Sequence, residues 1–512
     1  MKKIFILLIL LIPAAMVSQK PGLLRLELNA RMSEDTYEAI PCGSDGVLIF
    51  YEGQEGNDNV QNWHFALFDN QFREVWTTAK PLIAGMAYEA YSTEDGILCL
   101  LFYLNGKSRE EEPNMQIVEI VLEQGTFNIV SLSLEDKGEI AGFLTQNDHA
   151  VVGMNFKRYE SRLYFVNLLS GDVSAKIPDL EGQQWIERLT LDTTNFFVYA
   201  VLQKVDSREL AGLYLQKFNL KGNSFGMLEI NPVIDQKYLN NASVVPMGRD
   251  VYTLGTYNYY KNRAGSNDES TYPKSTGFYM AKFANEKQIF IHYYNFLEFR
   301  NLIHSFSAED IIRIRKRAEK QQSKEGESSL DYSVVVHPVI YHKGAFIMLA
   351  EAFYPEYHTV TNMYYDYYGR AVPQSHTVFD GYKFFSGIVA SFDAEGEIQW
   401  DNSLEIRNIL TSDLQKHLEI HPYRGEIAVI YNRNGRLHYK VFDRAGGHAF
   451  SEAEDTELGL KHGKDRLMDD ARSKVVHWYD HFFLVYGYQE LRNNALPGNR
   501  RSVFYLNKIA FQ

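Results

Sequence analysis

Cysteine is scarce in this sequence: Cys42 and Cys99 are the only two among 512 residues. Two cysteines can form one disulfide bond at most, so the chain cannot be a small secreted domain held together by a disulfide framework. Paired C-x-x-C motifs are absent too, which argues against zinc ribbons and thioredoxin-like redox sites. We therefore expect an apolar core to stabilise the fold, and a single bridge between the two cysteines stays open.

The sequence also lacks an excess of positive charge. It has 52 Lys and Arg against 65 Asp and Glu, which gives a formal net charge of -13. A chain this acidic repels phosphate groups at long range, so nucleic acid and anionic membrane surfaces are poor partners. We therefore predict that the protein does not bind nucleic acid.

Long apolar runs are missing beyond the N-terminus. No later stretch reaches the roughly 18 apolar residues of a membrane-spanning helix, so we expect no transmembrane segment in the mature chain. The apolar run at 4–11 follows Lys2 and Lys3 and precedes a proline and small residues. This pattern is typical of a bacterial secretory signal peptide. We predict a signal peptide at 1–18 and an exported bacterial protein in the periplasm, outside the cell or at the cell envelope.

Motifs of familiar catalytic centres are missing as well. The chain contains no G-x-S-x-G, no phosphate-binding Walker loop and no H-E-x-x-H. His417 and His421 are four residues apart, but Pro422 follows them directly, which disfavours a helical zinc site. We expect no metal, no cofactor and no catalytic residue, and we favour a binding protein over an enzyme.

What the sequence does contain is a repeat. A polar turn with Asp or Gly, a continuous apolar strand, a variable loop and an alternating strand recur eight times. Examples of the turn and apolar strand are SDGVLIFYEG (44–53), EDGILCLLFYL (94–104) and HKGAFIMLAEAF (342–353). Most units are about 50 residues apart, a period typical of β-propellers. Continuous apolar strands must be covered on both faces, as happens when each blade lies between two neighbours.

The repeat predicts an all-β fold, a single β-propeller over 19–512. We expect eight blades, or seven if one unit is degenerate. The last unit ends at its third strand, and the alternating stretch LLRLELN (23–29) near the N-terminus can supply the fourth. Such a strand would close the ring without leaving an open sheet edge.

The long insertions are predicted to share one face of the propeller. Turns between the first and second strands of each unit are short, and these open on one face. The loops 257–276 and 354–384, and an insertion at about 297–332, belong to connections that open on the other face. Long loops on a rigid scaffold are common sites of function, so we expect the binding surface there.

Tyrosine is concentrated in the two loops, most densely in YYDYYGR (364–370). Its ring and hydroxyl can anchor a protein partner or stack on a sugar. The two loops could instead pack on each other as a hairpin extension without a binding role. The candidate binding residues are Tyr257, Tyr259, Tyr260, Tyr354, Tyr357, Tyr364, Tyr365, Tyr367, Tyr368 and Arg370.

The insertion has the pattern of a helix near 300–328. Ser307 and Asp310 resemble a capping box, and basic residues follow on much of the helix surface. Arg313 and Arg317 would then face an acidic partner. The alternative is a solvated face that balances the negative charge of the protein itself.

Two stretches resemble a known propeller motif. FDAEGEIQW (392–400) and, less closely, FDNQFREVW (68–76) resemble the D-x-x-G-x-x-x-W end of repeats in quinoprotein-type propellers. The resemblance implies a blade architecture and does not extend to a quinone site. As a whole, the chain resembles uncharacterised secreted β-propellers of Gram-negative bacteria, a resemblance that implies no activity.

We therefore predict a non-catalytic binding or scaffold propeller that engages a protein partner of the cell envelope through its loop face. A carbohydrate-binding or carbohydrate-active propeller that uses the tyrosine-rich loops is the alternative. A purely structural role in the envelope is the third hypothesis.

Overall fold

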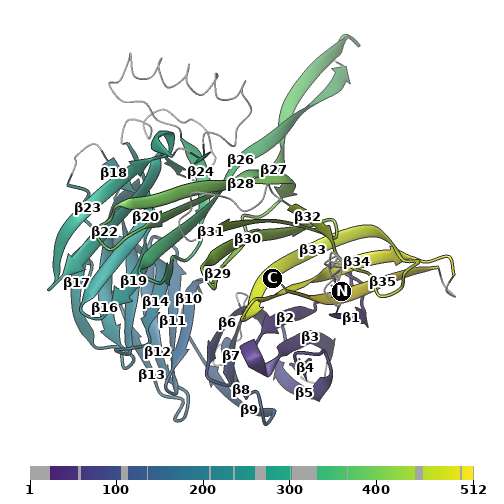
Figure 1. Cartoon of the computed structure of the whole chain (residues 1–512), viewed down its shortest axis with the longest axis horizontal. Coiled ribbons are helices and arrows are strands. Elements are labelled where there is room, and N and C mark those ends of the chain that lie inside the picture. Colours follow the sequence, from purple (N-terminus) through teal and green to yellow (C-terminus); the bar gives the residue numbers. More distant parts are fainter. Residues whose placement is uncertain are drawn as a thin grey trace, which may run out of the picture.

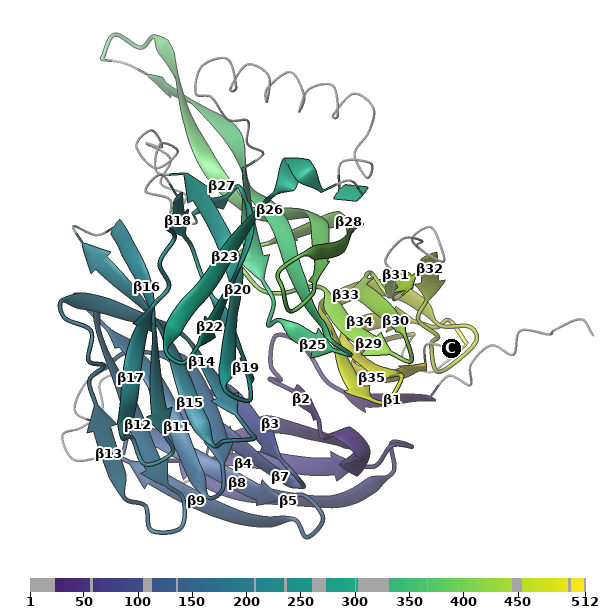
Figure 2. The ribbon, with the colours of Figure 1, turned by 60° about the vertical axis from the view of Figure 1, so that its left-hand side comes forward.

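The computed structural model describes residues 24–55, 59–104, 113–134, 137–206, 209–233, 237–259, 273–299, 301–302, 331–365, 367–443, 454–495 and 499–510. These residues form an all-β fold in which the strands are grouped into eight hydrogen-bonded sheets. Figure 1 and Figure 2 show the sheets following one another around a common centre. This is the β-propeller-like arrangement that the repeat predicts.

Four sheets come from the first half of the chain. The first contains β2 (Glu38–Pro41), β3 (Val47–Glu55), β4 (Val60–Phe68) and β5 (Glu74–Ile83). The second contains β6 (Ala87–Glu94), β7 (Ile97–Tyr103), β8 (Met115–Val121) and β9 (Thr126–Leu132). The third contains β10 (Glu139–Gln146), β11 (His149–Phe156), β12 (Glu160–Asn167) and β13 (Val173–Lys176). The fourth contains β14 (Gln183–Asp192), β15 (Phe197–Asp206), β16 (Glu209–Asn219) and β17 (Ser224–Glu229).

Four more sheets complete the ring. The fifth contains β18 (Lys237–Leu239), β19 (Ser243–Met247), β20 (Asp250–Tyr259), β22 (Gly277–Ala284) and β23 (Lys287–Asn295). The sixth contains β21 (Lys274–Ser275), β24 (Tyr332–Val336), β25 (Ile340–His342), β26 (Ala345–Tyr365), β27 (Ala371–Phe392) and β28 (Ile398–Thr411). The seventh contains β29 (Glu419–Tyr423), β30 (Glu426–Arg433), β31 (Arg436–Asp443) and β32 (Glu454–Glu457). The eighth contains β33 (Arg466–Tyr479), β34 (Phe482–Arg492), β35 (Arg500–Ala510) and β1 (Leu24–Asn29).

The core consists of apolar layers between neighbouring sheets. The continuous apolar strands β7 and β11 are buried along nearly their whole length, because a sheet covers each of their faces. Leu48 and Phe50 of the first sheet pack with Leu98 and Leu100 of the second, for example. Within the described residues, a comparable cluster lies between every pair of consecutive sheets, including the eighth and the first.

The innermost strands converge on the axis of the propeller. β10 lies against both β6 and β14, and β33 lies against both β29 and β2. These strands come first in their sheets, so the sheets run outwards from the axis in the order of the sequence, apart from the closing strand β1 of the eighth sheet. Side chains on the axial face of these strands therefore line a shared central channel.

A short strand links the fifth and sixth sheets. β21 precedes β22 of the fifth sheet directly in the chain, yet it pairs with β24 of the sixth. Counting the linked pair as one blade gives a seven-bladed propeller, the alternative count from the sequence. The expected count of eight blades requires every hydrogen-bonded sheet to be a separate blade. The link between the fifth and sixth sheets does not support this count.

The N-terminal strand closes the ring, as the sequence predicts. β1 pairs antiparallel with β35 from Leu24↔Lys508 to Asn29↔Val503. The two described ends of the chain therefore lie side by side in the eighth sheet (Figure 1). The eighth sheet thus keeps four strands, and β1 covers an edge of β35 that would otherwise be open.

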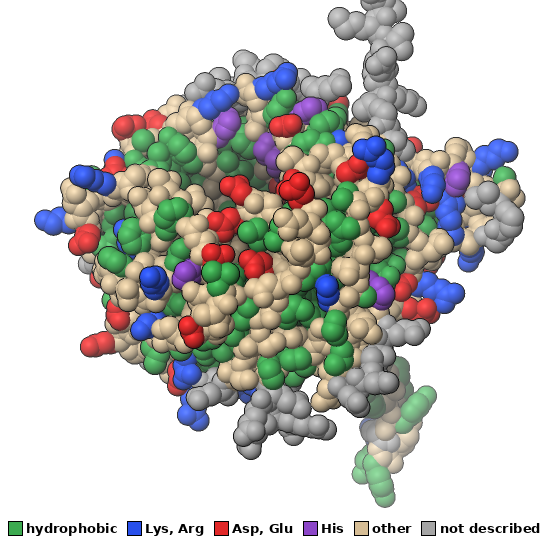
Figure 3. Space-filling model, turned by 90° about the horizontal axis from the view of Figure 1, so that it is seen from below, with side chains coloured by type: hydrophobic (Ala, Val, Ile, Leu, Met, Phe, Trp, Pro, Cys, Tyr) green, Lys and Arg blue, Asp and Glu red, His purple; other side chains and the backbone are tan. Residues whose placement is uncertain are grey.

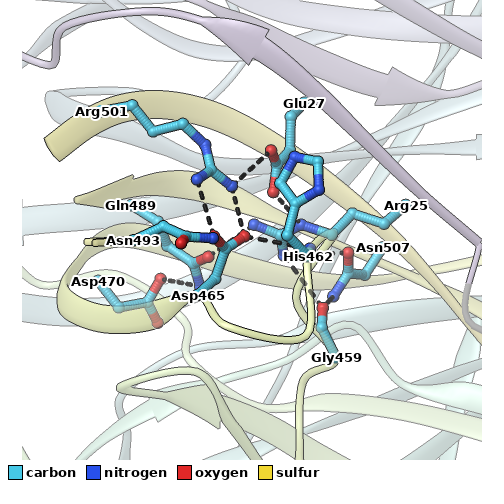
Figure 4. Close-up of polar contacts among 10 residues, drawn as sticks. All are labelled: Arg25, Glu27, Gly459, His462, Asp465, Asp470, Gln489, Asn493, Arg501 and Asn507. Atoms are coloured by element: carbon cyan, nitrogen blue, oxygen red, sulfur yellow. Dashed lines mark hydrogen bonds and ion pairs between the residues drawn. The ribbon is translucent and has the colours of Figure 1, made fainter. Parts of the chain in front are cut away.

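Buried ion pairs hold this closing strand in place (Figure 4). Arg25 and Glu27 of β1 pair at 2.7 Å, and both side chains are almost fully buried. Arg501 of β35 contacts Glu27 at 3.2 Å and Asp465 at 2.5 Å. The hydrogen bonds from Arg501 hold the pKa of Asp465 well below its usual range. Arg25 also donates to Gln489 at 2.8 Å, so the network joins three strands of the sheet.

The motif FDAEGEIQW forms the turn between β27 and β28. The Asp393 carboxylate accepts hydrogen bonds from the backbone N–H groups of Glu395 and Glu397. Gly396 has a φ of +83°, a conformation that other residues rarely adopt. Trp400 is buried and packs near Phe442 of the next sheet. The motif therefore serves blade packing, as its resemblance to propeller repeats implies.

Several expectations need correction or lie outside the described residues. The helical residues in the described part of the chain are the 3-10 turns η1 (Gly43–Asp45) and η3 (Phe296–Glu298) and the two residues 301–302, and no helix there is long and apolar enough to cross a bilayer. The helix expected near 300–328 lies almost wholly in 303–330, outside the described residues, and is not supported. The signal peptide at 1–18 lies outside them too. Cys42 and Cys99 are both free and buried, in different core clusters, so the open possibility of a bridge is not realised.

Candidate functional site

The segment 354–384 is a long β-hairpin and not the loop that the sequence predicts. β26 and β27 pair from Phe346↔Phe392 in the core to Tyr365↔Ala371 at the tip, with register shifts at Ala352/Phe353 and Glu356/Tyr357. The outer part contains Thr, Val and Tyr, which favour extended strands, and each residue finds a partner on the opposite strand. Figure 1 and Figure 2 both show this hairpin projecting away from the ring. The prediction failed because the repeat gave no sign that the strands continue beyond the blade.

The hairpin tip presents a group of exposed aromatic side chains. Tyr367 is 96 % exposed, and its ring meets that of Tyr368 edge to face at 5.5 Å. The Arg370 guanidinium lies 5.4 Å from the centre of the Tyr368 ring. The other large exposed apolar or aromatic side chains near the tip are Met363, Tyr364, Tyr365 and Val372.

Among the described residues, no part of the ring covers either face of the outer hairpin. Nearly all described side chains from 357 to 379 are exposed, on both strands. An isolated two-stranded ribbon is marginally stable in water, because it buries little apolar surface. The projecting strands are therefore only marginally stable by themselves, and the ring does not need them in order to close.

Both edges of the outer hairpin are also open within the described part of the chain. β28 pairs with β27 only between Tyr382 and Phe392, so it ends before the projecting part begins. Between 357 and 365, and again between 371 and 379, the sequence contains no Asp, Glu, Lys or Arg. Charged residues and prolines are the usual protection of sheet edges, and only Pro373 is present here. The hairpin thus offers unpaired, uncharged strand edges.

Polar and aromatic contacts stiffen the base of the hairpin. Lys383 forms an ion pair with Glu356 at 3.1 Å, and His358 contacts Asp380 at 2.5 Å. The rings of Tyr357 and Phe379 meet at 5.5 Å across the two strands. These cross-strand pairs aim the tip away from the ring. Tyr354 and Tyr357 belong to this base region.

The remaining predicted residues do not join the hairpin tip. Tyr257 is 1 % exposed and packs with Tyr259 and Tyr293 of its own sheet, so its role is structural. Tyr259 is half-buried at the end of β20. Tyr260, Arg313 and Arg317 lie outside the described residues. The structure therefore brings together six of the predicted tyrosines, at 354–368, with Arg370, and separates them from those of the first loop.

A second group of residues, which the sequence did not indicate, lines the central channel. Glu351 of β26 is fully buried and lies 2.6 Å from His337 Nε2. It also accepts hydrogen bonds from the backbone N–H groups of His417 and Leu418, both at 2.9 Å. Glu351 thereby fixes the connection that leads from β28 to β29, next to the channel. This connection places Lys416 beside the axis.

Lys416 and Glu419 have perturbed pKa values in this group. Burial, and then the positive charge of Arg188, lowers the pKa of Lys416 to about 8. Burial raises the pKa of Glu419 to about 7, although a backbone hydrogen bond from His477 and the charge of Lys416 oppose the change. Arg188 belongs to the fourth sheet and Glu419 to the seventh, so the group spans the channel. Titratable groups with pKa values near neutrality are common at functional sites.

Histidines form a neighbouring cluster in the sixth to eighth sheets. The rings of His421 and His477 stack with centres 3.4 Å apart. Burial, and then the nearby charge of His477, lowers the pKa of His421 to about 4. Figure 3 shows Asp, Glu and His side chains gathered near the hollowed middle of one face. No set of three His, Cys, Asp or Glu among the described residues is placed to hold a metal ion.

One signal in the sequence could have revealed the channel group. Glu351 interrupts the otherwise apolar stretch AFIMLAEAF, and a carboxylate inside a buried strand needs hydrogen-bond donors around it. Lys416, Glu419 and Arg188 gave no such signal, because charged residues at strand ends and in connections are common. Only the closed ring brings these residues together.

Comparison with known proteins shows distant similarity in fold. No family model matches the chain, and no curated protein matches it. The solved structure of the dihydro-heme d1 dehydrogenase NirN in complex with DHE is 10 % identical over 95 % of this chain and 79 % of that one, with a TM-score of 0.43. Polysaccharide lyase Uly1 is 10 % identical over 83 % of this chain and 90 % of its own, with a TM-score of 0.39.

A third solved structure covers less of the chain. Cobalt-substituted Synechocystis ACO is 9 % identical over 50 % of this chain and 61 % of its own, with a TM-score of 0.31. The present chain therefore spans less than two thirds of that protein. At this level of similarity the three structures carry no argument about what this chain binds.

Proposed function

We propose that the protein is an exported, non-catalytic β-propeller that binds a protein partner of the cell envelope through its β26–β27 hairpin. One observation carries the proposal: the hairpin projects from the ring, and no other described residues cover its faces or pair with its edges. A ribbon of this kind gains stability when another chain covers it. The ring then acts as the rigid support that presents the hairpin.

The open edges favour a protein partner. An extended segment of another protein can add to a free strand edge through backbone hydrogen bonds, a common mode of peptide recognition. The aromatic tip supplies anchor residues of the kind that dominate protein interfaces. A partner that pairs with the edge and covers the tip would satisfy both features at once.

The location in the cell envelope rests on the sequence. The charged and apolar pattern at 1–18 predicts export, and an exported scaffold meets its partners in the envelope or outside the cell. Detection of the mature N-terminus after residue 18 by Edman sequencing or mass spectrometry of the native protein would test this step.

A photo-crosslinking experiment tests the hairpin directly. A photoreactive amino acid replaces Tyr367 at the tip or, as a control, Leu169, an exposed apolar residue in a turn of the third sheet. We expect one defined protein crosslink in cells from position 367 and none from 169. The crosslink should disappear when Thr359 and Thr377, a cross-strand pair, are both changed to Lys. Equal crosslinks from 367 and 169, or none, would contradict the proposal.

Carbohydrate binding is a second candidate that the exposed tyrosines favour. Tyr365, Tyr367 and Tyr368 present ring faces to solvent, as sugar-binding surfaces do. A glycan array tests it with the purified protein and with a variant in which these three residues are Ser. Glycan binding by the parent protein that the variant loses, together with an absence of protein crosslinks, would replace the first candidate by this one.

We further propose that the fifth and sixth sheets act as two separate blades, which makes eight. A complete apolar cluster lies between them, where Leu254 and Met280 meet Phe346 and Met348. Such a layer is typical of two neighbouring blades. An experimental structure in which these two sheets pack as one continuous blade would overturn the count.

A further inference from the structure

A cavity beside the channel is lined by the innermost strands of the sixth, seventh and eighth sheets. Its volume is about 420 Å³, within the roughly 300–1,000 Å³ that is typical of small-ligand sites. One part of the wall is apolar and contains Ile340, Ile420 and Val476. The other part contains Lys416 and Glu419, together with three more titratable residues. These are His337, His417 and Lys474.

Lys416 lacks a counter-ion at contact distance. Within the ranges that the structure describes, no carboxylate forms an ion pair with its ammonium group, although the protein as a whole is acidic. Glu351 and Glu419 act on it only from a distance. Glu351 already receives hydrogen bonds from His337, His417 and Leu418. A cation in this setting leaves room for a negative ligand.

A second cation lies near the cavity without being part of its wall. Burial, and to a smaller extent the positive charge of Arg188, lowers the pKa of both Lys416 and His337, two residues of the cavity wall. The Arg188 guanidinium donates to Ser243 Oγ at 2.8 Å and forms no ion pair among the described residues. Two like charges near each other repel. An anion bound at Lys416 would relieve this repulsion.

The remaining wall residues accommodate such an anion. Burial brings the pKa of Glu419 to about 7, so a large share of this carboxyl group is protonated at neutral pH and repels an anion less. The Nε2 atom of His417 is buried and has no hydrogen-bond partner in the described structure. Burial also lowers the pKa of His417, so the ring is neutral at pH 7.

We propose that this cavity binds a small organic carboxylate. The carboxylate group binds the Lys416 ammonium group, and the apolar part of the ligand packs against Ile340, Ile420 and Val476. The apolar wall favours an organic acid over inorganic phosphate, which has no apolar part to bury. This site is independent of the hairpin and of any partner bound there.

Calorimetric titration of the whole protein with sodium hexanoate and sodium benzoate tests the proposal. We expect both to bind, and inorganic phosphate to bind at least about tenfold more weakly. Lys416→Met should weaken hexanoate binding at least about tenfold, since a charged hydrogen bond is lost. Lys221→Met, which removes an exposed lysine from a turn of the fourth sheet, should bind like the parent protein. Equal affinities of the Lys416→Met variant and the parent, no carboxylate binding, or phosphate binding as tight as hexanoate would overturn the proposal.

Amine labelling gives a readout that does not depend on a variant folding correctly. An acylating reagent attacks neutral amines, so at pH 8 Lys416 should react faster than Lys221, as mass spectrometry of the labelled peptides can show. Hexanoate should slow the labelling of Lys416 and leave Lys221 unchanged. Protection of both lysines to the same extent, or of neither, would contradict a site at Lys416.

Discussion

At the scale of single residues, Glu351 holds a buried carboxylate that depends on hydrogen-bond donors from its neighbours. It is fully buried, and its carboxylate receives three hydrogen bonds, from His337 and from two backbone N–H groups at 417 and 418. Glu351→Gln keeps the shape but replaces one acceptor oxygen by a donor, which leaves buried donors without partners. We expect the free energy of unfolding to fall by about 3 kcal/mol. Urea denaturation followed by circular dichroism measures it.

The control for this prediction is Glu395→Gln. Glu395 is exposed in the turn between β27 and β28, and only its backbone N–H takes part in the turn. Its substitution should change the free energy of unfolding by less than about 0.5 kcal/mol. A loss of stability in Glu351→Gln no greater than in this control would show that the carboxylate does not hold the connection.

Single residues also mark the limit of prediction from the sequence. The apolar core of the strands was predictable, because a run such as ILCLLFY needs cover on both faces wherever it lies. The approach of Arg188 to Lys416 was not, since it depends on two sheets meeting across a channel. The two residues are more than 200 positions apart in the chain, so no local sequence pattern indicates that they approach each other.

At the scale of elements, the closing strand β1 depends on Arg25. Its side chain is almost fully buried and is bound by Glu27, Gln489 and Asn507. Arg25→Met removes the charge and leaves Glu27 with fewer partners, so we expect a loss of about 3–5 kcal/mol in the free energy of unfolding. Proteolysis near the N-terminus should also become faster, because β1 separates from β35 more often. Limited proteolysis and urea denaturation report the two effects.

Arg31→Met is the matched control for this strand. Arg31 lies just after β1 and forms an exposed ion pair with Glu34 at 3.0 Å. Exposed pairs contribute little to stability, so both measurements should stay close to those of the parent protein. If Arg25→Met behaved like this control, the buried network would not be what holds the ring closed.

For the outer hairpin we expect the opposite result, namely that its removal leaves the stability of the fold nearly unchanged. Replacing 357–379 by a short Asn-Gly turn should leave the midpoint of thermal unfolding within about 3 °C, because nearly all described side chains in this range are exposed. Differential scanning calorimetry measures the midpoint. A large decrease would mean that the outer hairpin serves the fold rather than a partner.

The outline of this element was only partly predictable. The sequence placed YYDYYGR (364–370) at the end of an insertion in the sixth unit, and the structure has it at the hairpin tip. The continuous pairing of its flanks was missed because Thr, His, Gln and Asn side chains exposed on both faces resemble a polar loop. Pairing between 357–365 and 371–379 is a property of two segments taken together.

At the scale of the whole molecule, histidines and glutamates that are at least half-buried oppose each other in their response to pH. Burial lowers the pKa of His337, His417, His421 and His477 below the ordinary value of 6.5. Burial raises the pKa of Glu187 and Glu419 from 4.5 to about 7. The two groups lie around one channel, so a single titration reports both.

The signs follow from proton binding in the two states. Between about pH 4 and 6.5, the unfolded state binds more protons at the histidines, so their effect makes stability fall as the pH falls. Between 4.5 and about 7, the folded state binds more protons at the glutamates, so their effect makes stability fall as the pH rises. The two effects offset each other between pH 4.5 and 6.5, and we expect a shallow dependence there.

Removing the glutamate contribution should expose that of the histidines. In the double variant Glu187→Gln and Glu419→Gln, the free energy of unfolding should rise clearly from pH 4.5 to 6.5, whereas that of the parent protein should change little. Urea denaturation at several pH values measures both curves. The control is the variant with Glu286 and Glu395, both exposed, changed to Gln, which should follow the parent. The opposing groups face one channel. If the free energy of unfolding of the double variant and of the parent changed with pH in the same way, the channel would be well solvated. These groups would then titrate as they do in the unfolded chain.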